Sequence, residues 1–316
     1  MLFAIAWIVV SNAPSFGFQV ESSKSFVPRK REESRIICSS SRRGAIQNIF
    51  VASSLCCNNS PANAVQTNTN NNNNNNGANL PSEGEIENSI PTLWEENPFD
   101  TSYETMFSRL DNSPDSIFYA EPRFVEHIDD NAVRTLTSYI SDRLLHPKDV
   151  VLDLCSSWTS HISVGTKQKL KHVVGLGMNS EELVANPMLD RFLVQDLNVR
   201  PQLPLEDSVF DVVLCQLSID YLTKPLDVMK EVGRVLKPGG TAAIFFSNRL
   251  FLNKAVGIWA GADDIDHAYT VGAYLHFSNG GFENITAEDL STRESRWLGG
   301  RIVGDPLYVV KAIKKV

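Results

Sequence analysis

The stretch VLDLCSSWTSHI, residues 151–162, places one carboxylate and several hydroxyls at the end of an apolar run. A buried parallel strand that runs into a tight turn is where many folds wrap a glycine-rich loop around a cofactor. This stretch contains no glycine. Asp153 could cap the turn or orient loop amides, while Ser156, Ser157 and Thr159 could cap the next helix and offer hydroxyls to a carboxylate. These residue types leave open whether the site binds a cofactor by other means.

Polar side chains also lie at or after the ends of three further apolar runs. They are Asn179 after HVVGLG (172–177), Asp196 in RFLVQDL (191–197) and Gln216 in FDVVLCQL (210–217). Ligands of open α/β sheets bind outside the carboxyl ends of the strands. Asn179 also predicts a helix start, because Glu182 follows three residues later, as in a capping box.

From Pro91 onward, strand and helix signals alternate, which predicts a parallel sheet with helices on both faces. The expected helices are 129–145, capped by Asp129 or Asp130, a stunted helix after the 155–159 loop that Val164, Gly165 and Thr166 interrupt, then 179–189, 225–236 and 267–281. The expected strands are 149–154, 172–177, 191–197, 210–217, 241–246, 282–289 and 306–315. The fold class is therefore α/β, a Rossmann-like, doubly wound, mostly parallel seven-stranded sheet with an antiparallel last strand.

The segment PLEDSVFDVVLCQLSIDYLTKPLDVMKEVGRVLKPGGTAAIFF, residues 204–246, resembles the second half of a class I S-adenosylmethionine-dependent methyltransferase of the type-11 group. The family pattern there is L-P-F-x-D-x-x-F-D-V-V, a short loop, then E-x-x-R-V-L-K-P-G-G and a strand. Leu205 stands where phenylalanine is usual. With the flanking strands, the resemblance covers roughly 116–316. It looks closest to a plastid-associated plant and algal subgroup that shares LDLCSSW, GLGMN and QDLN.

The resemblance implies methyl transfer from S-adenosylmethionine to a small-molecule or lipid-like acceptor that the sequence does not identify. The sulfonium already activates the methyl group, so in-line positioning supplies most of the acceleration. A general base is needed only when the acceptor must lose a proton. The family's site residues therefore mostly hold the cofactor.

The family's D-x-G-x-G-x-G motif at the end of the first strand falls on Asp153, with Cys155, Ser157 and Thr159 at the glycine places. An L-residue where a glycine adopts positive φ costs about 1–2 kcal/mol. Three such residues would remove a large part of the net stability of a domain. We therefore expect the loop to follow a different path from that of the family.

The family's ribose-binding acid falls on Gly177, and Asn179 or Glu181 could replace it from the next turn. Asp196 stands where the family's aspartate accepts from the adenine amine, with Leu197 offering its backbone amide. No metal is expected. The resemblance thus gives as cofactor-binding residues Asp153, Cys155, Ser157, Asn179, Asp196, Leu197 and Gln216.

Candidates on the acceptor side follow the fourth strand or flank a late helix, and no catalytic base is identified among them. They are Asp220, Tyr221, His267 and His276, and either histidine is as well explained by a structural role. Upstream, Tyr119, Arg123 and His127 lie on a segment that could fold over the cofactor. Trp158 could lay its ring against a sulfonium cation or fill the space that a cofactor would occupy.

Of the five cysteines, only Cys155 and Cys215 lie outside the N-terminal region, which is not the pattern of a disulfide scaffold. The first and fourth strands are neighbours in this topology, so the two cysteines should end side by side. We expect two reduced thiols, with a redox-sensitive pair as the alternative. A Cα separation above about 7 Å would exclude a disulfide.

The chain carries 29 Lys and Arg against 37 Asp and Glu, and residues 1–64 hold more basic than acidic residues. The rest of the chain is therefore more acidic than the whole. Such a body lacks the basic surface that neutralises phosphates, so nucleic acid is not an expected partner. No apolar run of about 18 residues follows the N-terminal region, so no stable membrane span is expected in the mature chain. The oligomeric state is not indicated.

Residues 1–64 resemble a layered targeting leader. A short apolar signal-like run is followed by Ser-rich basic sequence and then by Arg42-Arg43 with a moderately apolar core. Signal, transit-like and twin-arginine segments in series resemble the leaders of plastid proteins in algae with complex plastids. We expect delivery to the plastid, with the thylakoid lumen as a further step and the secretory pathway as the alternative.

The domain organisation follows from these segments. Residues 65–90 are polar and Asn-rich and are expected to form a disordered linker, because they cannot bury enough apolar surface. Residues 91–316 are expected to form the methyltransferase-like domain.

Two functions remain open. Asp153, Asp196 and the 204–246 segment favour an active methyltransferase. The altered loop and Gly177 favour a catalytically degenerate fold that acts as a binding or assembly module. A nicotinamide-dependent oxidoreductase is excluded because the chain has no G-x-G-x-x-G motif.

Overall fold

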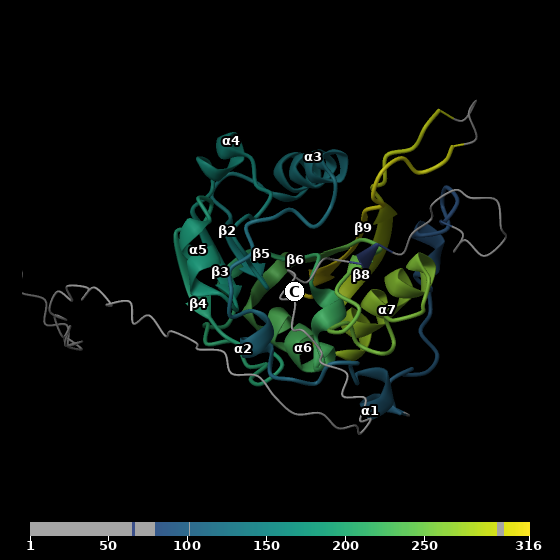
Figure 1. Ribbon diagram of the computed structural model, residues 1–316. Coiled ribbons are helices and arrows are strands. Elements are labelled where there is room, and N and C mark those ends of the chain that lie inside the picture. Colours follow the sequence, from purple (N-terminus) through teal and green to yellow (C-terminus); the bar gives the residue numbers. More distant parts are fainter. Residues whose placement is uncertain (1–64, 67–79, 101, 296–299) are drawn as a thin grey trace, which may run out of the picture. The chain divides into compact units, whose positions relative to one another are not determined.

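The computed structural model describes residues 65–66, 80–100, 102–295 and 300–316. The predicted leader (1–64) and the Asn-rich tract (68–79) lie outside these residues. The described part forms a seven-stranded sheet in the order β4-β3-β2-β5-β6-β9-β8 (Figure 1). Its strands are β2 Val150–Leu154, β3 His172–Gly177, β4 Arg191–Val194, β5 Phe210–Gln216, β6 Leu236–Phe246, β8 Phe282–Asp289 and β9 Tyr308–Lys314.

The first five of these strands in chain order run parallel to one another. β9 lies between β6 and β8 and pairs antiparallel with both. This arrangement confirms the predicted Rossmann-like sheet with an antiparallel last strand. A separate two-stranded sheet joins β1 (Val65–Gln66) to β7 (Arg249–Leu250).

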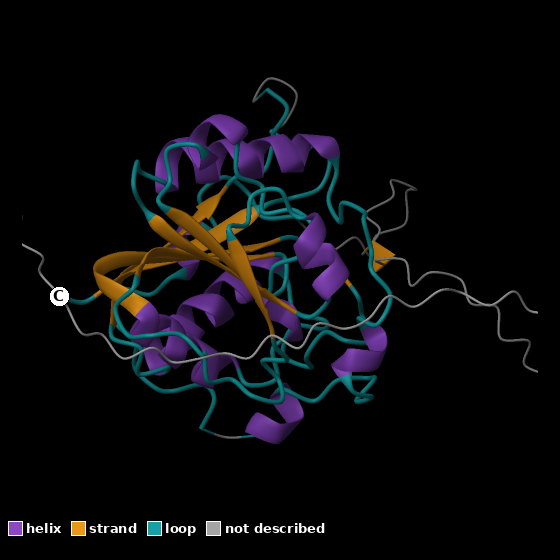
Figure 2. Ribbon diagram, turned by 90° about the vertical axis from the view of Figure 1, so that its left-hand side faces the viewer, coloured by secondary structure: helices purple, strands orange, loops and turns teal. Residues whose placement is uncertain are grey.

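Helices cover both faces of the sheet (Figure 2). They are α1 Tyr103–Met106, α2 Asp115–Phe118, α3 Asp130–Tyr139, α4 Val164–Lys167, α5 Ser180–Ala185, α6 Pro225–Val235 and α7 Asp264–Phe277, with single turns at Glu87–Ser89, Ile140–Leu144 and Ile219–Tyr221. None of the described helices is long and apolar enough to cross a membrane.

Alternate side chains of the central strands enter two separate apolar cores. Val151 of β2 packs on one face with Leu136 of α3, whereas its neighbour Leu152 packs on the other face with α6 and α7. Asp129 begins α3, because its side chain accepts from the backbone N–H groups of Asn131 and Ala132. Strands buried on both faces need continuous apolar sequence, and all five residues of β2 are buried, Asp153 included.

Several boundaries differ from the sequence prediction. The helix expected over 129–145 ends as an α-helix at Tyr139 and continues as a wider π-type turn to Leu144. β4 ends at Val194, which places Asp196 in the loop that follows. The folded body also begins before Pro91, since Ile86 in the predicted linker is fully buried in the core. Only Leu80, Ile86 and Ile90 are large apolar residues in the stretch 67–90, too few to give a periodic pattern, so the sequence did not indicate the burial of Ile86.

Candidate functional site

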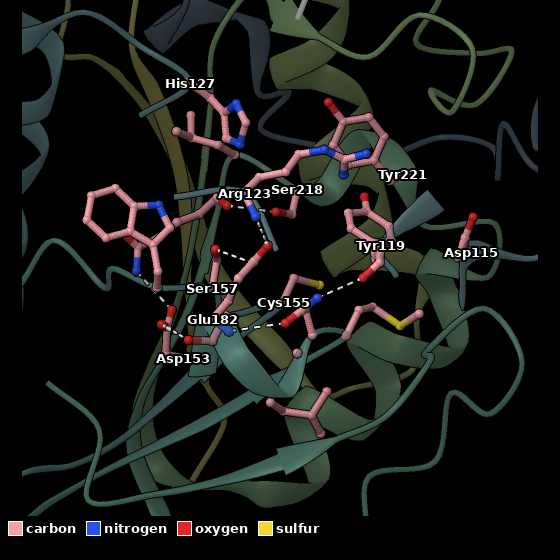
Figure 3. A pocket seen from close by; sticks show the side chains of 18 of the residues that line it. Asp115, Tyr119, Arg123, His127, Asp153, Cys155, Ser157, Glu182, Ser218 and Tyr221 are labelled. Atoms are coloured by element: carbon pink, nitrogen blue, oxygen red, sulfur yellow. Dashed lines mark hydrogen bonds between the residues drawn. The ribbon is translucent and has the colours of Figure 1, made fainter. Parts of the chain in front are cut away.

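A cavity opens at the carboxyl ends of β2, β3, β4 and β5, where open α/β sheets bind their ligands (Figure 3). The cavity has a volume of about 150 Å³. The loops after these four strands form its floor, and residues from 115–127 form part of its wall. All seven expected cofactor-binding residues line it: Asp153, Cys155, Ser157, Asn179, Asp196, Leu197 and Gln216.

The loop after β2 departs from the glycine pattern in a specific way. Cys155, at the first glycine place, has a φ of 56°, in the left-handed region that glycine normally occupies. Ser157 and Thr159, at the other two places, are not among the residues with positive φ. At the three glycine places the chain therefore accepts one strained residue, at a cost of about 1–2 kcal/mol, and then takes another route, along which His161 also has a positive φ of 47°.

That route crosses the end of β3. The Ser156 N–H donates to the Leu176 carbonyl at 2.8 Å. A Cβ atom added to Gly177 would lie 2.1 Å from the Ser156 carbonyl oxygen, closer than any real contact. No acid can therefore stand at Gly177 while the loop keeps this path. The two departures from the family, the missing glycines and the missing ribose acid, have one structural cause.

Asp153 holds this loop in place. Its carboxylate is buried and accepts hydrogen bonds from the Ser156 hydroxyl at 2.5 Å, the Ser160 hydroxyl at 2.7 Å and the Gln216 amide at 2.9 Å. Burial raises the pKa of Asp153, and the three donors oppose that rise. Hydroxyl groups of the loop thus supply the bonds that keep an isolated carboxylate stable inside the protein.

Gln216 connects Asp153 to a histidine that the sequence did not single out. Because the Gln216 amide nitrogen donates to Asp153, its oxygen accepts from the His161 Nδ1–H at 2.8 Å. His161 Nε2 lies 3.1 Å from the Glu126 carboxylate. Burial would lower the pKa of His161, but the bond to Glu126, the charge of Glu126 and the bond to Gln216 raise it overall. A polar chain thus joins Asp153 to the cavity wall.

Asn179 and Glu182 join α5 to the cavity. The Asn179 side chain caps α5 by accepting from the Glu181 and Glu182 N–H groups, and it donates to the Tyr119 carbonyl at 3.0 Å. The predicted capping box is wrong in its second half, because Glu182 does not bond back to Asn179. Its buried carboxylate accepts instead from the Arg123 N–H at 2.7 Å and the Ser157 hydroxyl at 2.6 Å. In the sequence, the clue to Glu182 is its position in the first turn of the helix that follows β3.

Of the two carboxylate oxygens of Asp196, only one accepts hydrogen bonds from the described residues. Its Oδ1 accepts from the N–H groups of Asn198 and Val199 at 2.9 and 3.2 Å. Oδ2 has no hydrogen-bond donor among the described residues, although Asp196 lines the cavity. Leu197 beside it is buried. The geometry suits a carboxylate that closes a turn with one oxygen and can accept from a ligand with the other.

The segment upstream of α3 folds over the cavity, where it contributes Tyr119, Arg123 and His127 together with Asp115. Asp115 anchors it: the carboxylate accepts from Arg109 and Asn198 at 2.8 Å, and the buried Lys254 ammonium lies 3.4 Å away. Three charged side chains and an amide thus fix this wall to the loop after β4. Asn198 and Lys254 lie far from Asp115 in the sequence, so no local sequence pattern indicates these two contacts.

The acceptor-side candidates separate in space. Tyr221 lines the cavity, and its hydroxyl accepts from the Phe251 N–H at 2.9 Å. Asp220 is buried behind it, where burial raises its pKa to about 8, and its Oδ2 has no partner. His267 is buried against Trp259, with ring centroids 4.0 Å apart. His276 is exposed and stacks on Trp94. Neither histidine is among the lining residues.

Trp158 forms part of the cavity wall and leaves the cavity open. Its ring N–H donates to the Val125 carbonyl at 3.2 Å, and its ring meets that of Phe124 edge-on. Cys155 and Cys215 are both free thiols. A hydrogen bond with the Cys155 thiol and burial raise the pKa of Cys215. The two thiols are therefore neighbours, as the topology predicted.

Comparison with known proteins gives a family for this part of the chain. Residues 158–244 match the family model described as a methyltransferase domain. The match confirms the resemblance to methyltransferases over these residues. The narrower likeness to a plastid-associated subgroup stays a prediction. A stretch of 116 residues is 30% identical to the malonyl-[acyl-carrier protein] O-methyltransferase of Marinomonas sp. (strain MWYL1). It covers 36% of this chain and 42% of that protein, so the chain spans less than half of this curated relative.

Similar solved structures include two further proteins. A SAM-dependent methyltransferase of Methanosarcina mazei is 18% identical, with a TM-score of 0.38 over 54% of this chain and 95% of that chain. The Haemonchus contortus phosphoethanolamine N-methyltransferase 2, in complex with phosphomonomethylethanolamine and S-adenosylhomocysteine, is 12% identical. Its TM-score is 0.39 over 59% of this chain and 53% of that chain.

Proposed function

We propose that this methyltransferase-family chain transfers a methyl group from S-adenosylmethionine to a small-molecule or lipid-like acceptor. One observation carries the proposal: the seven residues expected to bind the cofactor, spread over 153–216, all line one cavity at the carboxyl edge of the sheet. A fold that had lost its ligand would have no need to keep this space open.

The residues around the cavity fit the cofactor's chemistry. Asp196 Oδ2 is an unused acceptor for the adenine amine, and the buried Leu197 can lie against the adenine ring. The Glu182 carboxylate, bonded to Ser157 and to the Arg123 N–H, is the acid closest in role to the missing ribose acid. When bound, the sulfonium supplies an activated methyl group. The protein's part is to orient the two reactants and exclude water.

The cavity wall also contains side chains that can accept a proton from the group to be methylated. Glu126 and His161 form a pair on the cavity wall, and the His161 ring is held by Gln216. The Glu126 carboxylate, which is hydrogen-bonded to the buried His161 ring, can take a proton from an O–H or N–H group of the methyl acceptor. We propose this pair as the base where the reaction requires one.

Calorimetric titration of the full chain with S-adenosylmethionine and S-adenosylhomocysteine tests the proposal. We expect saturable binding of both ligands. Asp196→Ala should weaken that binding at least tenfold, since about 1.4 kcal/mol is lost with one charge-assisted hydrogen bond. Asp207→Ala is the matched control, because Asp207 is exposed and lies outside the cavity.

The second function is a binding or assembly module that keeps the fold without the reaction. The observation that favours it is that Asp153 is fully engaged by loop hydroxyls and Gln216. The same titration separates the two functions. No saturation by millimolar S-adenosylmethionine would exclude methyl transfer and leave the module.

A further inference from the structure

We propose that Arg123 forms an anion-binding subsite on the acceptor side of the cavity, so that the methyl acceptor carries a carboxylate or a phosphate. This inference rests on the proposed methyltransferase function. It concerns the class of acceptor, which neither the family match nor the relatives determine for this chain.

Both ends of Arg123 are fixed. Its backbone N–H donates to the Glu182 carboxylate at 2.7 Å, and its guanidinium donates to the Phe118 carbonyl at 2.8 Å. The guanidinium carbon lies 4.3 Å from the centre of the Phe118 ring, 5.8 Å from Tyr119 and 5.6 Å from Phe251. Three aromatic rings thus hold the guanidinium plane in place. An arginine ordered in this way loses little further entropy on binding a ligand.

The guanidinium lacks an ionic partner. Among the described residues no carboxylate forms an ion pair with it, whereas nearby Arg109 and Lys254 both pair with Asp115. Of the described residues that line the cavity, Arg123 is the only arginine or lysine. Burial lowers the pKa of His127 beside it; the charge of Glu126 opposes this shift and the charge of Arg123 adds to it. A partly buried cation with unused N–H donors in a cavity is a receptor for an anion.

The position of the guanidinium assigns it to the acceptor and not to the cofactor. Figure 3 shows Arg123 beside Tyr119 and Tyr221, on the side of the cavity away from Asp153. The stacking of Arg123 with Phe251, which lies 6.0 Å from the Tyr221 ring, agrees with this placement. The expected cofactor residues lie at the carboxyl ends of β2, β3, β4 and β5 or on the loops that follow them, whereas Arg123 lies on the segment upstream of α3.

The surroundings also indicate an apolar body next to the anion. A second, smaller hollow shares Tyr221, Phe251, Leu217 and His127 with the main cavity and is otherwise lined by Ile128, Leu250 and Arg249. An alkyl or aryl portion could pack against these rings while the anion bonds to the planar guanidinium fork. The acceptor class is therefore a small amphipathic anion.

A matched set of six-carbon probes tests the subsite on the full chain loaded with S-adenosylhomocysteine. Hexanoate and hexyl phosphate carry the anion, hexanol lacks it, and hexylamine reverses the charge. We expect both anions to bind at least tenfold more tightly than hexanol, and hexylamine to bind least. The better of the two anions identifies carboxylate or phosphate as the natural group.

Arg123→Gln should remove the preference for the anions and leave hexanol binding unchanged, while Arg123→Lys should retain part of it. Arg143→Gln is the control, because Arg143 also lies over an aromatic ring, Tyr139 at 4.7 Å, but outside the cavity. Far-ultraviolet circular dichroism and a melting curve establish that each variant is folded. If Arg123→Gln does not fold, the Lys variant and the four probes on the natural chain still decide the matter.

Two results would overturn the inference. One is equal binding of hexanoate, hexyl phosphate and hexanol. The other is an Arg123→Gln chain that loses S-adenosylhomocysteine but keeps its preference for the anions, which would assign the guanidinium to the cofactor's carboxylate. Failure of the proposed function appears separately, as no binding of S-adenosylhomocysteine at all, and the same probes on the unloaded chain then still report on Arg123.

Discussion

Asp153 and Asp220 are both buried carboxyls near the cavity, and their surroundings differ sharply. Asp153 accepts three hydrogen bonds from side chains that the loop and β5 provide. Asp220 has one oxygen without any partner and lies next to Tyr221. Burial disfavours the charged form of both carboxyls and raises the pKa of each. Three side-chain donors oppose that rise at Asp153, whereas Asp220 has no donor for its second oxygen.

The pH dependence of stability should follow from Asp220. Burial raises its pKa from 3.8 to about 8, so the folded protein binds a proton more tightly than the unfolded chain. The stabilisation is complete below the unfolded pKa and is lost as the pH rises toward the folded one. Between about pH 4 and pH 8 each pH unit should lower the free energy of unfolding by up to ~1.4 kcal/mol.

Urea unfolding at pH 5, 7 and 9 measures this dependence, and Asp220→Asn should flatten it. Exposed Asp142→Asn is the control and should leave the slope unchanged. An Asp220→Asn chain with the same slope as the natural protein would show that the carboxyl does not titrate in this range.

At the scale of elements, the loop after β2 and the end of β3 form one unit. The loop reaches β3 through the Ser156 N–H and passes directly over Gly177. α5 then starts at Asn179 and sends Glu182 back to Ser157. Each of these contacts depends on the others, because the loop path fixes which residues can stand at the end of β3.

Replacing Gly177 with the acid that the family usually has should therefore lower both stability and cofactor affinity. Gly177→Asp places a Cβ atom 2.1 Å from the Ser156 carbonyl, so the loop must move. We expect a loss of roughly 1–3 kcal/mol in the free energy of unfolding and weaker binding of S-adenosylhomocysteine. Denaturant melts and calorimetry measure the two effects.

Gly165→Ala is the matched control, since an added Cβ there meets nothing within 4 Å. Tighter cofactor binding by Gly177→Asp would contradict the coupling between the loop path and β3. It would show that the loop adopts the family's path as soon as the acid is present.

At the scale of the whole molecule, the folded body begins earlier than the composition indicates. Ile86 is fully buried in the core that contains α6 and α7, although the residues around it are polar and acidic. The Glu87 carboxylate accepts from the Asp289 N–H at 3.0 Å, at the end of β8. The segment before Pro91 therefore packs on the sheet and is part of the domain.

Ile86→Ala should test this boundary. Removal of a fully buried isoleucine side chain is expected to lower the free energy of unfolding by about 2–5 kcal/mol. Ile117→Ala is the control, because Ile117 is 67% exposed and should cost less than about 0.5 kcal/mol. Equal stability of the two variants in guanidinium chloride would place the boundary back at Pro91.

The sequence by itself determined the order of strands and helices and the strand-end positions that line the cavity. The order of elements arises from local periodicity, and parallel strands end at one edge of the sheet. Together with the family resemblance, this placed Asp153, Asp196 and Gln216 at the cavity without coordinates. Local caps were equally readable, as Asp129 and Asn179 show.

Only the tertiary structure decided which side chains meet. His161 with Glu126, Glu182 with Ser157, and Arg123 with Phe251 are contacts between residues that are not neighbours in the chain. The path of the loop after β2 was likewise undetermined, because the three residues at the glycine places each could adopt several backbone conformations. Contact with Gly177 selects one of them. Such choices depend on packing between elements, and a linear pattern contains no record of it.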